Sequence, residues 1–392
     1  MQQATSSTSS LPAWWYDRTA RALALQATLL FVVVAAAIFF FSNVQTNMAA
    51  RGLTLGFGFL DRSAGIPIGE YLIPYTPSNS YARALLVGLL NTLRVAIIGC
   101  LLVTLLGVFL GILRLSENPL LSGLVGAYIE IVRNTPVVLQ LVFWLVVFQQ
   151  LPSVREALNP LPGVYLSQRG LKIPVLEWND AAVFALAGLA LAIAAIVWTT
   201  RRARAHQMQT GEYRRVWPIC VGYLVMLPLA AAQLTGDRLI LSVPELQGFN
   251  FAGGAELSPE FAALLTGLVI YTAAFVAEIV RSGIQSVGKG QWEASRALGL
   301  SNGRIMRLVI LPQALRVIVP PLTSQYLNLT KNSSLAIVIG YQDLFSVSNT
   351  SINQTGQAIE VIFIMMTVYL VLSLLTAAGM NIYNARVALK ER

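Results

Sequence analysis

The amino-acid sequence predicts an all-α polytopic membrane protein with about eight transmembrane helices. Of its 392 residues, 56% are hydrophobic, and the mean hydropathy is +0.65. Only 11% are charged, whereas soluble globular domains carry about 25% charged residues. Apolar runs recur along the chain, and about 20 apolar residues in a helix are enough to cross a bilayer. These three observations place most of the chain in lipid.

The apolar runs predict eight spans in order along the chain: 22–42, 84–113, 120–150, 181–199, 216–233, 260–281, 317–340 and 357–381. Residues 1–21 are expected to form a cytoplasmic tail, disordered over the Gln-, Thr- and Ser-rich residues 1–13, with an interfacial aromatic belt at 14–16. A cleaved signal peptide is the alternative for the first span. Such a peptide has a shorter apolar core and an A-x-A cleavage site, so we favour an uncleaved helix.

The segments between the spans are polar and are expected to be loops. Residues 43–83, 151–179, 234–259 and 341–355 are assigned to outer loops, and 201–215 to an inner loop with five arginines. The span at 216–233 is short and broken by proline, and the polar run 328–334 interrupts the span at 317–340.

Positive charge sets the orientation. Under this topology, 17 of the 27 lysines and arginines lie in inner segments and seven in outer segments, while Arg94, Arg133 and Lys331 fall within spans. Lysine and arginine concentrate on the cytoplasmic side of membrane proteins, so both termini are expected in the cytoplasm. The net charge of +9 is therefore explained without nucleic acid.

The sequence argues against metal sites, cofactors and catalysis in this chain. Its two cysteines, Cys100 and Cys220, lie inside apolar spans, and its single histidine, His206, lies in the arginine-rich loop. No cluster of metal ligands or nucleophile and base can be assembled from them. No G-x-x-x-x-G-K-[ST] phosphate-binding loop occurs, so ATP would have to be bound elsewhere.

The most informative stretch is the polar, basic segment 283–316 between two spans. Gly290 is expected to begin a helix and Gly299 to end it, since glycine accepts the left-handed backbone of many helix ends. Ser301 is a candidate N-cap for a second helix that runs to Leu311 and Pro312. The segment predicts two helices at the membrane surface, joined at a glycine, with the shape of an element held by a partner protein.

This stretch resembles the EAA coupling loop of ABC-importer permease subunits. Glu293-Ala294-Ser295, Gly299 and Val309-Ile310-Leu311-Pro312 match its pattern, with Ser295 in place of the second alanine and Val309 in place of isoleucine. Two blocks are similar to the polar amino acid subgroup of these permeases. One contains R-N-T-P-V-V-L-Q at 133–140, and the other includes 257–287 and 329–335. Together they cover about two thirds of the chain.

The resemblance implies a type I ABC importer transmembrane domain over 84–384, with the coupling loop at 283–316 and a two-helix insert at about 155–250. An additional N-terminal helix and a periplasmic segment would occupy 22–83, and a cytoplasmic tail 385–392. The layout is similar to that of the larger permease of a general L-amino acid importer. It implies a bacterial inner-membrane protein that imports L-amino acids.

The resemblance also implies partners. These are an ATPase dimer that binds ATP and Mg²⁺, a second permease subunit in a heterodimer, and a periplasmic amino-acid-binding protein. No cofactor is expected in this chain. The residues expected to transmit force from the ATPase are Glu293, Ala294, Ser295, Arg296 and Gly299. The small ones allow close approach to a groove in the partner. Glu293 either pairs with the partner or favours the positive end of its helix, and Arg296 either pairs or is a solvated charge.

A substrate path is expected among polar groups inside the spans, because each costs a few kcal/mol in lipid unless it is paired or faces water. Glu130 with Arg133, and Glu278 with Arg281, have the spacing of paired neighbours on a helix. Pro136 is expected to break its helix, and broken helices expose ends that bind ions. Kinks and pairs that are only structural remain an alternative. The candidates are Arg94, Glu130, Arg133, Thr135, Glu278, Lys331, Asn332 and Ser333, with Glu360 as a further acid inside a span.

Two other function classes compete with this hypothesis. An ion-coupled secondary amino acid transporter would work without an ATPase, and such transporters usually carry internal repeats and paired intramembrane acids. The sequence has no obvious repeat, and Glu130, Glu278 and Glu360 lie at unrelated positions. A membrane enzyme or assembly factor ranks last, because no nucleophile and base set is visible among the spans.

Overall fold

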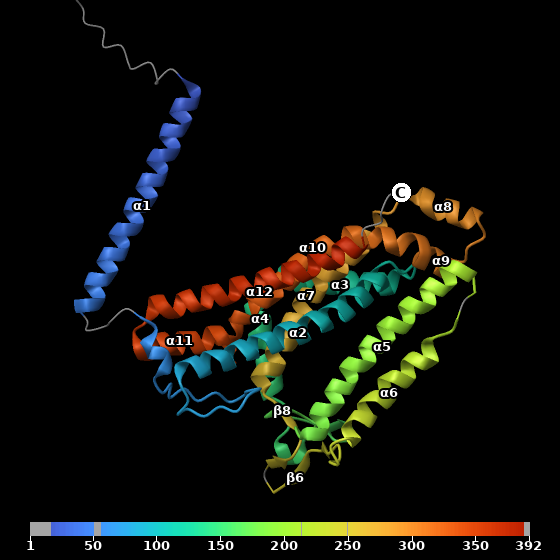
Figure 1. The fold of residues 1–392 in the computed structure, drawn as a ribbon, viewed down its shortest axis with the longest axis horizontal. Coiled ribbons are helices and arrows are strands. Elements are labelled where there is room, and N and C mark those ends of the chain that lie inside the picture. Colours follow the sequence, from blue (N-terminus) through green and yellow to red (C-terminus); the bar gives the residue numbers. More distant parts are fainter. Residues whose placement is uncertain (1–16, 51–55, 213, 249, 388–392) are drawn as a thin grey trace, which may run out of the picture.

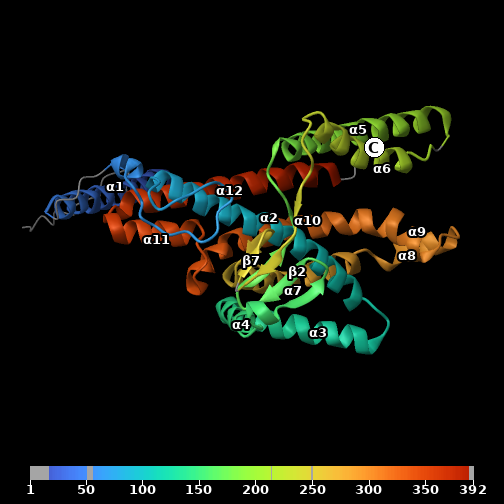
Figure 2. The ribbon, with the colours of Figure 1, turned by 90° about the horizontal axis from the view of Figure 1, so that it is seen from below.

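The computed structural model describes residues 17–50, 56–212, 214–248 and 250–387 (Figure 1). The tail predicted at 1–13, the aromatic belt at 14–16 and the basic residues Lys390 and Arg392 lie outside the described residues. The described chain is mainly helical, as predicted, and the helices form an elongated bundle. Helices α8 and α9 lie at one end of this bundle and α11 at the other (Figures 1 and 2).

The first helix, α1 (Arg18–Ala50), stands apart from the bundle (Figure 1). Its leucine, valine and phenylalanine side chains are exposed along its length. An apolar helix with no protein around it suits lipid, which agrees with a first transmembrane span.

The centre of the bundle is a pair of long helices, α2 (Tyr81–Arg114) and α7 (Pro259–Gln285). They approach closely because α2 presents glycine to α7. A β-carbon added at Gly111 would lie 2.8 Å from the carbonyl oxygen of Ala277. Small residues of this kind allow helices in lipid to pack backbone against backbone. Around this contact lie the buried Val103, Val276 and Val280.

The predicted span at 120–150 is two helices, α3 (Pro119–Asn134) and α4 (Val137–Gln149), bent by 107°. The break falls at Pro136, as predicted, because proline lacks the N–H that would continue the helix. Both helices pack on α7.

The last third of the bundle contains α10 (Leu311–Asn332), the 3₁₀ helix η5 (Ser333–Ile339), α11 (Leu344–Thr355) and α12 (Ala358–Val387). The polar run at 328–334 changes the helix type rather than ending the span. The loop predicted at 341–355 was wrong, since α11 occupies most of it. Asp343 caps that helix by accepting a hydrogen bond from the Ser346 amide at 2.9 Å. One face of α11 is buried against a cluster formed with the 3₁₀ helix η2 (Phe57–Asp61).

The predicted insert contains a hairpin of two helices, α5 (Asp180–Thr210) and α6 (Trp217–Gln233). The two pack closely on each other, and the hairpin lies beside the bundle (Figure 2). Helix α5 extends past the predicted span end at residue 199 and carries Arg201, Arg202 and Arg204 on its last turns. The arginine-rich loop lies at the same end of the molecule as α8 and α9 (Figures 1 and 2).

The remainder of the insert is β-structure, which corrects the purely helical prediction. After a 3₁₀ turn, η3 (Val154–Glu156), the strands β1 (Leu158–Leu161), β2 (Val164–Ser167), β3 (Gly170–Ile173) and β8 (Ala255–Leu257) form an antiparallel sheet in that order. Two small antiparallel pairs accompany it: β4 (Val175–Leu176) with β5 (Leu241–Ser242), and β6 (Glu245–Gln247) with β7 (Asn250–Ala252). The loops predicted at 151–179 and 234–259 therefore pair with each other.

Six helical segments in the described residues are long and apolar enough to cross a membrane, or seven if α3 and α4 count as one span. With that pair counted, these segments correspond to seven of the eight predicted spans. The eighth, at 216–233, is α6, which has 17 residues and contains Pro228. The prediction of about eight spans is therefore close, and only α6 falls short of the usual length.

Candidate functional site

The predicted coupling segment forms two short helices at the end of the bundle, α8 (Lys289–Ala297) and α9 (Asn302–Ile305). We call residues 289–305 the elbow. Glu293, Ala294 and Arg296 are exposed on α8. Ser295 is buried and donates a hydrogen bond to the carbonyl oxygen of Gln291. Ser295 therefore faces the bundle, and its side chain is not on the surface offered by the other predicted coupling residues.

Gly299 ends α8 as predicted, with a left-handed φ of +73°. Its amide donates to the carbonyl oxygen of Arg296 at 2.9 Å, and the Leu300 amide donates to that of Ser295 at 3.3 Å. These two bonds close the end of the helix. No atom lies within 4 Å of the position a β-carbon would take on Gly299, so the backbone conformation, and not space, is what requires glycine there.

Leu298 was missed by the sequence interpretation. It lies at the tip of the elbow, just before Gly299, and its side chain is 80% exposed. Together with the exposed Ala294 and Ala297, it forms a small apolar surface flanked by Glu293 and Arg296. The signal available in the sequence was a leucine between Arg296 and Gly299 of the predicted motif, and no periodicity marks it.

The second half of the elbow corrects two predictions. Ser301 occupies the N-cap position of α9, but its side chain makes no capping hydrogen bond. The helix does not end at Pro312. A π-helical turn, η4 (Met306–Ile310), leads directly into α10. Proline cannot donate to the carbonyl four residues earlier, and the wider π turn absorbs that break. One helical path thus runs from the elbow to Asn332.

The break between α3 and α4 is closed by side chains of the 133–140 motif. Gln140 donates from Nε2 to the carbonyl oxygens of Val132 at 2.9 Å and Thr135 at 3.1 Å. The Thr135 hydroxyl donates to the Ile131 carbonyl at 2.8 Å. Carbonyl groups freed by the bend are thereby satisfied, as a nonpolar environment requires.

Of the two ion pairs predicted near this break, the structure contains one. Glu278 and Arg281 form the predicted ion pair. The pair predicted between Glu130 and Arg133 was wrong: both are exposed, and the Arg133 guanidinium lies 5.0 Å from the centre of the Phe275 ring instead. The spacing permits either contact, and the neighbouring aromatic ring on α7 provides a cation–π partner.

The polar residues at the end of α10 are not gathered around an opening. Lys331 is exposed, Asn332 is half-buried, and Ser333 is buried with its hydroxyl donating to the Thr330 carbonyl at 2.8 Å. Glu360 is buried at the start of α12, where one carboxylate oxygen accepts from the Gly56 amide at 2.8 Å. Of all the predicted path residues, only Arg94 lines the large polar cavity described next.

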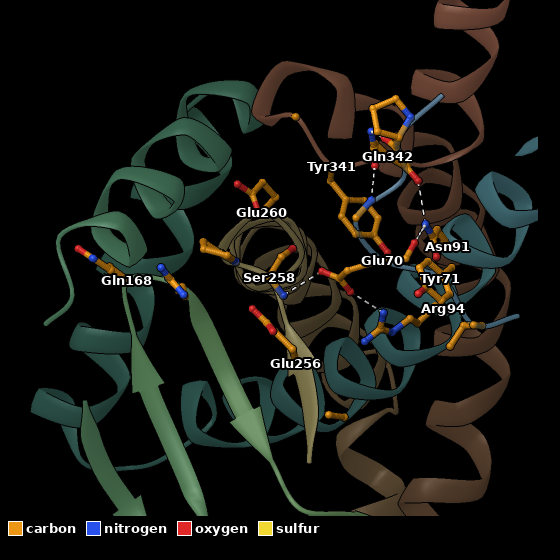
Figure 3. A pocket seen from close by; sticks show the side chains of 17 residues that line it. Glu70, Tyr71, Asn91, Arg94, Gln168, Glu256, Ser258, Glu260, Tyr341 and Gln342 are labelled. Carbon is orange, nitrogen blue, oxygen red and sulfur yellow. Dashed lines mark hydrogen bonds and ion pairs between the residues drawn. The ribbon is translucent and has the colours of Figure 1, made fainter. Parts of the chain in front are cut away.

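This cavity has a volume of about 900 Å³ (Figure 3) and lies at the start of α7, whereas the elbow follows the end of α7. Its walls come from four parts of the chain: residues 67–72, α2, the sheet of the insert with the first turn of α7, and residues 340–342. Charged groups of both signs line it: Glu70, Arg94, Arg169, Glu256 and Glu260. Cavities of this size are typical of small-molecule sites.

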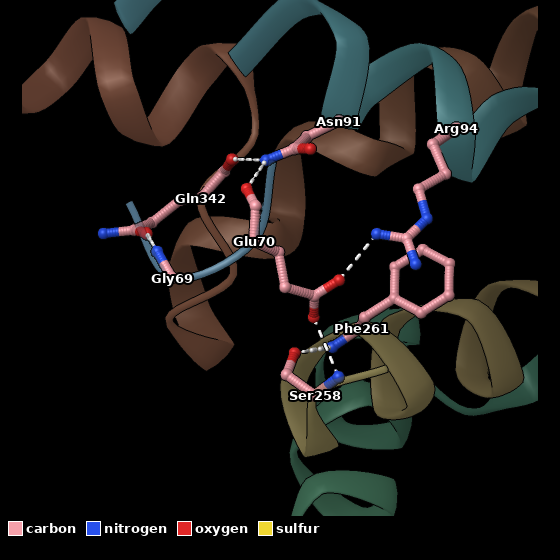
Figure 4. Close-up of polar contacts among 7 residues, drawn as sticks. All are labelled: Gly69, Glu70, Asn91, Arg94, Ser258, Phe261 and Gln342. Atoms are coloured by element: carbon pink, nitrogen blue, oxygen red, sulfur yellow. Dashed lines mark hydrogen bonds and ion pairs between the residues drawn. The ribbon is translucent and has the colours of Figure 1, made fainter. Parts of the chain in front are cut away.

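An ion pair between Glu70 and Arg94 joins three of these walls (Figure 4). The Arg94 Nη1 atom lies 2.6 Å from Glu70 Oε2, and the two side chains are only 15% and 13% exposed. The other Glu70 oxygen accepts from the Ser258 amide at 2.8 Å, at the N-cap of α7. The Arg94 guanidinium also lies 4.2 Å from the centre of the Phe261 ring. Glu70 therefore neutralises the charge that the sequence placed in an apolar span.

Amide side chains fix the fourth wall beside this pair. Asn91 donates from Nδ2 to the carbonyl oxygens of Glu70 and Gln342, both at 2.9 Å. The Gln342 side chain in turn accepts from the Gly69 amide at 2.8 Å. Residues 340–342 are thus bound to the segment before α2, and the cavity has a defined shape on this side (Figure 4).

Comparison with known proteins gives consistent results. The family described as "Binding-protein-dependent transport system inner membrane component" matches residues 219–389. YhdX of Escherichia coli (strain K12), whose name describes an amino-acid ABC transporter permease, is 48% identical over 95% of this chain and 96% of its own length.

Two further relatives also match over nearly their full length. The general L-amino acid transport system permease protein AapQ of Rhizobium johnstonii is 45% identical over 96% of this chain and 94% of its own length. The glutamate/glutamine/aspartate/asparagine transport system permease protein BztB of Rhodobacter capsulatus is 39% identical over 96% of each chain.

Proposed function

Because the chain belongs to the family of binding-protein-dependent transport system inner membrane components, we propose that it is the membrane-spanning permease subunit of an ATP-driven importer of L-amino acids. The relatives that match its whole length are named as amino-acid permeases. The protein is a multi-pass membrane protein with several apolar helices of spanning length.

The elbow is the observation that carries the ATP-driven part of this proposal. Its exposed surface is small and mixed in character, with Ala294 and Leu298 between a carboxylate and a guanidinium. A short helix of this kind fits a groove in a partner protein, with apolar anchors for affinity and charges for register. ATP would be bound by that partner, since the chain has no phosphate-binding loop.

The elbow is packed against, and continuous with, the helices α7 and α10, so a partner that binds the elbow could move both helices. Trp292 and Leu300 of the elbow pack against the cluster around Val280, Ile284 and Ile310. Helix α7 leads into α8, and α9 leads through the π turn into α10. Closure of an ATPase dimer would therefore shift the ends of two spanning helices together, which is the coupling between binding energy and gate that transport requires.

The remaining parts of the assembly follow from the family. We infer a substrate-binding protein that delivers amino acids on the outer side, and a second permease subunit of different sequence. We also infer that both termini and the elbow face the cytoplasm. Two observations support this orientation: 17 of the 27 basic residues fall in inner segments under the predicted topology, and the arginine-rich segment 201–215 lies at the elbow end of the molecule. Positive charge concentrates on the cytoplasmic face.

Two variants of the elbow test the proposal, each with a matched control. Glu293→Arg and Gly299→Asp are expected to reduce recovery of the ATPase in a pull-down and to reduce ATP-driven amino acid uptake in proteoliposomes at least tenfold. Glu212→Arg is the control for charge, and Gly58→Asp for glycine, because Gly58 lies outside the elbow and has ordinary backbone and free space. Uptake that survives both elbow variants would refute the coupling role.

A second measurement on the purified chain tests the alternative, an ion-coupled transporter. The purified chain alone, in liposomes with a sodium or proton gradient and no ATP, is expected to show no uptake. Gradient-driven uptake without an ATPase would overturn the proposed function, whatever the elbow variants do.

A further inference from the structure

The polar cavity contains two charged side chains that have no ion-pair partner within the described residues, and they have opposite signs. Two pairs neutralise most of the lining charge: Glu70 with Arg94, and Glu256 with Lys172 at 2.6 Å. Arg169 and Glu260 line the same cavity and take part in neither pair. A cavity with one free cation and one free anion is suited to a ligand that carries both charges.

Arg169 reaches the cavity from the insert. It lies in the tight turn between β2 and β3, where its amide donates to the Ser167 hydroxyl at 3.3 Å. The next residue, Gly170, has a φ of +106° and packs directly on β8, where a β-carbon would collide with the Leu257 backbone. The turn is therefore held firmly against the sheet, and this fixes the base of the Arg169 side chain.

Glu260 reaches the cavity from the bundle. It is in the first turn of α7, two residues after the N-cap Ser258. It lines the cavity, and Figure 3 shows it between Gln168 and Tyr341 in that view. A carboxylate there is also favoured by the positive end of the α7 dipole.

We propose that this cavity is a vestibule that binds a free L-α-amino acid as a zwitterion, with Arg169 on its carboxylate and Glu260 on its ammonium group. The inference rests on the proposed function and adds a site to it. A guanidinium offers a planar pair of donors that suits a carboxylate. The volume of about 900 Å³ exceeds that of any single amino acid, so side chains of different sizes fit once the backbone is held. The insert would thus supply one half of the recognition.

Direct binding to the purified permease and ATPase complex, without a binding protein, tests the vestibule. The probes are L-glutamine, L-glutaminamide, which lacks the carboxylate, and N-acetyl-L-glutamine, which lacks the ammonium group. Calorimetry of the wild-type complex is expected to show weaker binding of both analogues than of L-glutamine. Arg169→Gln and Glu260→Gln should each weaken L-glutamine binding about tenfold, the size expected for loss of one charge-assisted contact.

The pattern across probes separates recognition from structural damage. Arg169→Gln should abolish the preference for L-glutamine over L-glutaminamide and keep the preference over the N-acetyl compound; Glu260→Gln should do the reverse. Arg238→Gln and Glu245→Gln, which neutralise exposed insert charges outside the cavity, should bind all three probes as the wild type does.

Two results would overturn the vestibule. One is a wild-type complex that imports amino acids with ATP but binds L-glutamine no better than its analogues. The other is binding that Arg169→Gln and Glu260→Gln leave unchanged. Either leaves the proposed function standing, since uptake is measured separately. A complex that shows no ATP-driven uptake when the binding protein is also supplied would instead refute the proposed function itself.

Discussion

Removing the charge of Glu70 should destabilise the cavity end of the bundle, because it leaves Arg94 without its counter-ion in a largely buried site. Glu70→Gln keeps an oxygen that can accept from the Ser258 amide, and it keeps the size of the side chain. What it removes is the 2.6 Å contact with the guanidinium. The variant therefore isolates the charge from the hydrogen bond at the start of α7.

The magnitude can be estimated from the structure. Breaking a fully buried ion pair by removing one partner costs about 3–5 kcal/mol. Here both side chains keep slight exposure, and the Phe261 ring still faces the guanidinium at 4.2 Å, which offsets about 1 kcal/mol. We expect Glu70→Gln to lower the free energy of unfolding by about 2–3 kcal/mol, and the coupling energy between Glu70 and Arg94 to be about 2 kcal/mol.

A double-mutant cycle measures this coupling. Wild type, Glu70→Gln, Arg94→Gln and the double variant would be unfolded by SDS titration in mixed micelles. The pair Lys172 and Glu256 provides a matched control, because Glu256 is 49% exposed and such pairs contribute less than about 1 kcal/mol. A Glu70–Arg94 coupling no larger than that of the control pair would show that the reasoning about burial is wrong.

Three further predictions concern single residues. Gly299→Ala should reduce the ATPase recovered in a pull-down several-fold, since a left-handed alanine costs about 1–2 kcal/mol, while Gly303→Ala should not. Burial raises the pKa of Asp343 to about 6, so the folded state binds the proton more tightly than the unfolded state does. The free energy of unfolding should therefore fall by up to about 3 kcal/mol as the pH rises from about 4 to 6. Asp343→Asn, which retains an N-cap residue, should remove that fall in an unfolding series at fixed pH values. Gln140→Leu should lower the free energy of unfolding by about 1–3 kcal/mol in SDS titration. It removes the side-chain donor to the Thr135 carbonyl and leaves the Val132 carbonyl only the Thr135 amide at 3.4 Å. Gln149→Leu on the same α4 helix is the control.

The helices that cross the bundle could be predicted because lipid imposes a simple rule. A helix surrounded by lipid or by other helices must be apolar over about 20 residues, so the spans at 84–113 and 260–281 fall within α2 and α7. The first half of the elbow was equally accessible, since Gly299 marks a helix end by its backbone alone. Its second half was not, because proline usually ends a helix and the π turn before Pro312 leaves no pattern in the sequence.

The cavity is formed by contacts between residues that are far apart in the sequence, and such contacts could not be predicted from it. Arg94 was identified as a charge in an apolar span, but its partner Glu70 lies 24 residues away in a segment with no regular structure. Strand β3 pairs with β8 across more than 80 residues, with Leu171 opposite Leu257. Strands of two to four residues are too short to show the alternation that predicts a strand. The sheet, and the side chain of Arg169 that it positions, therefore emerge only from tertiary packing.

The elbow and the cavity lie at opposite ends of the same two helical paths, and this arrangement bears on how transport would be coupled. Helix α7 begins directly after its N-cap Ser258, which lies in the cavity wall, and it ends beside α8. Its 27 residues extend about 40 Å at 1.5 Å per residue. The second path leaves the elbow through the π turn, follows α10 and η5, and reaches Tyr341 in the opposite wall. Because packed helices move as rigid bodies and not by continuous deformation, a displacement of the elbow would reach both walls. The ion pair between Glu70 and Arg94 ties the α7 wall to α2, so any such movement must either carry α2 along or separate that pair.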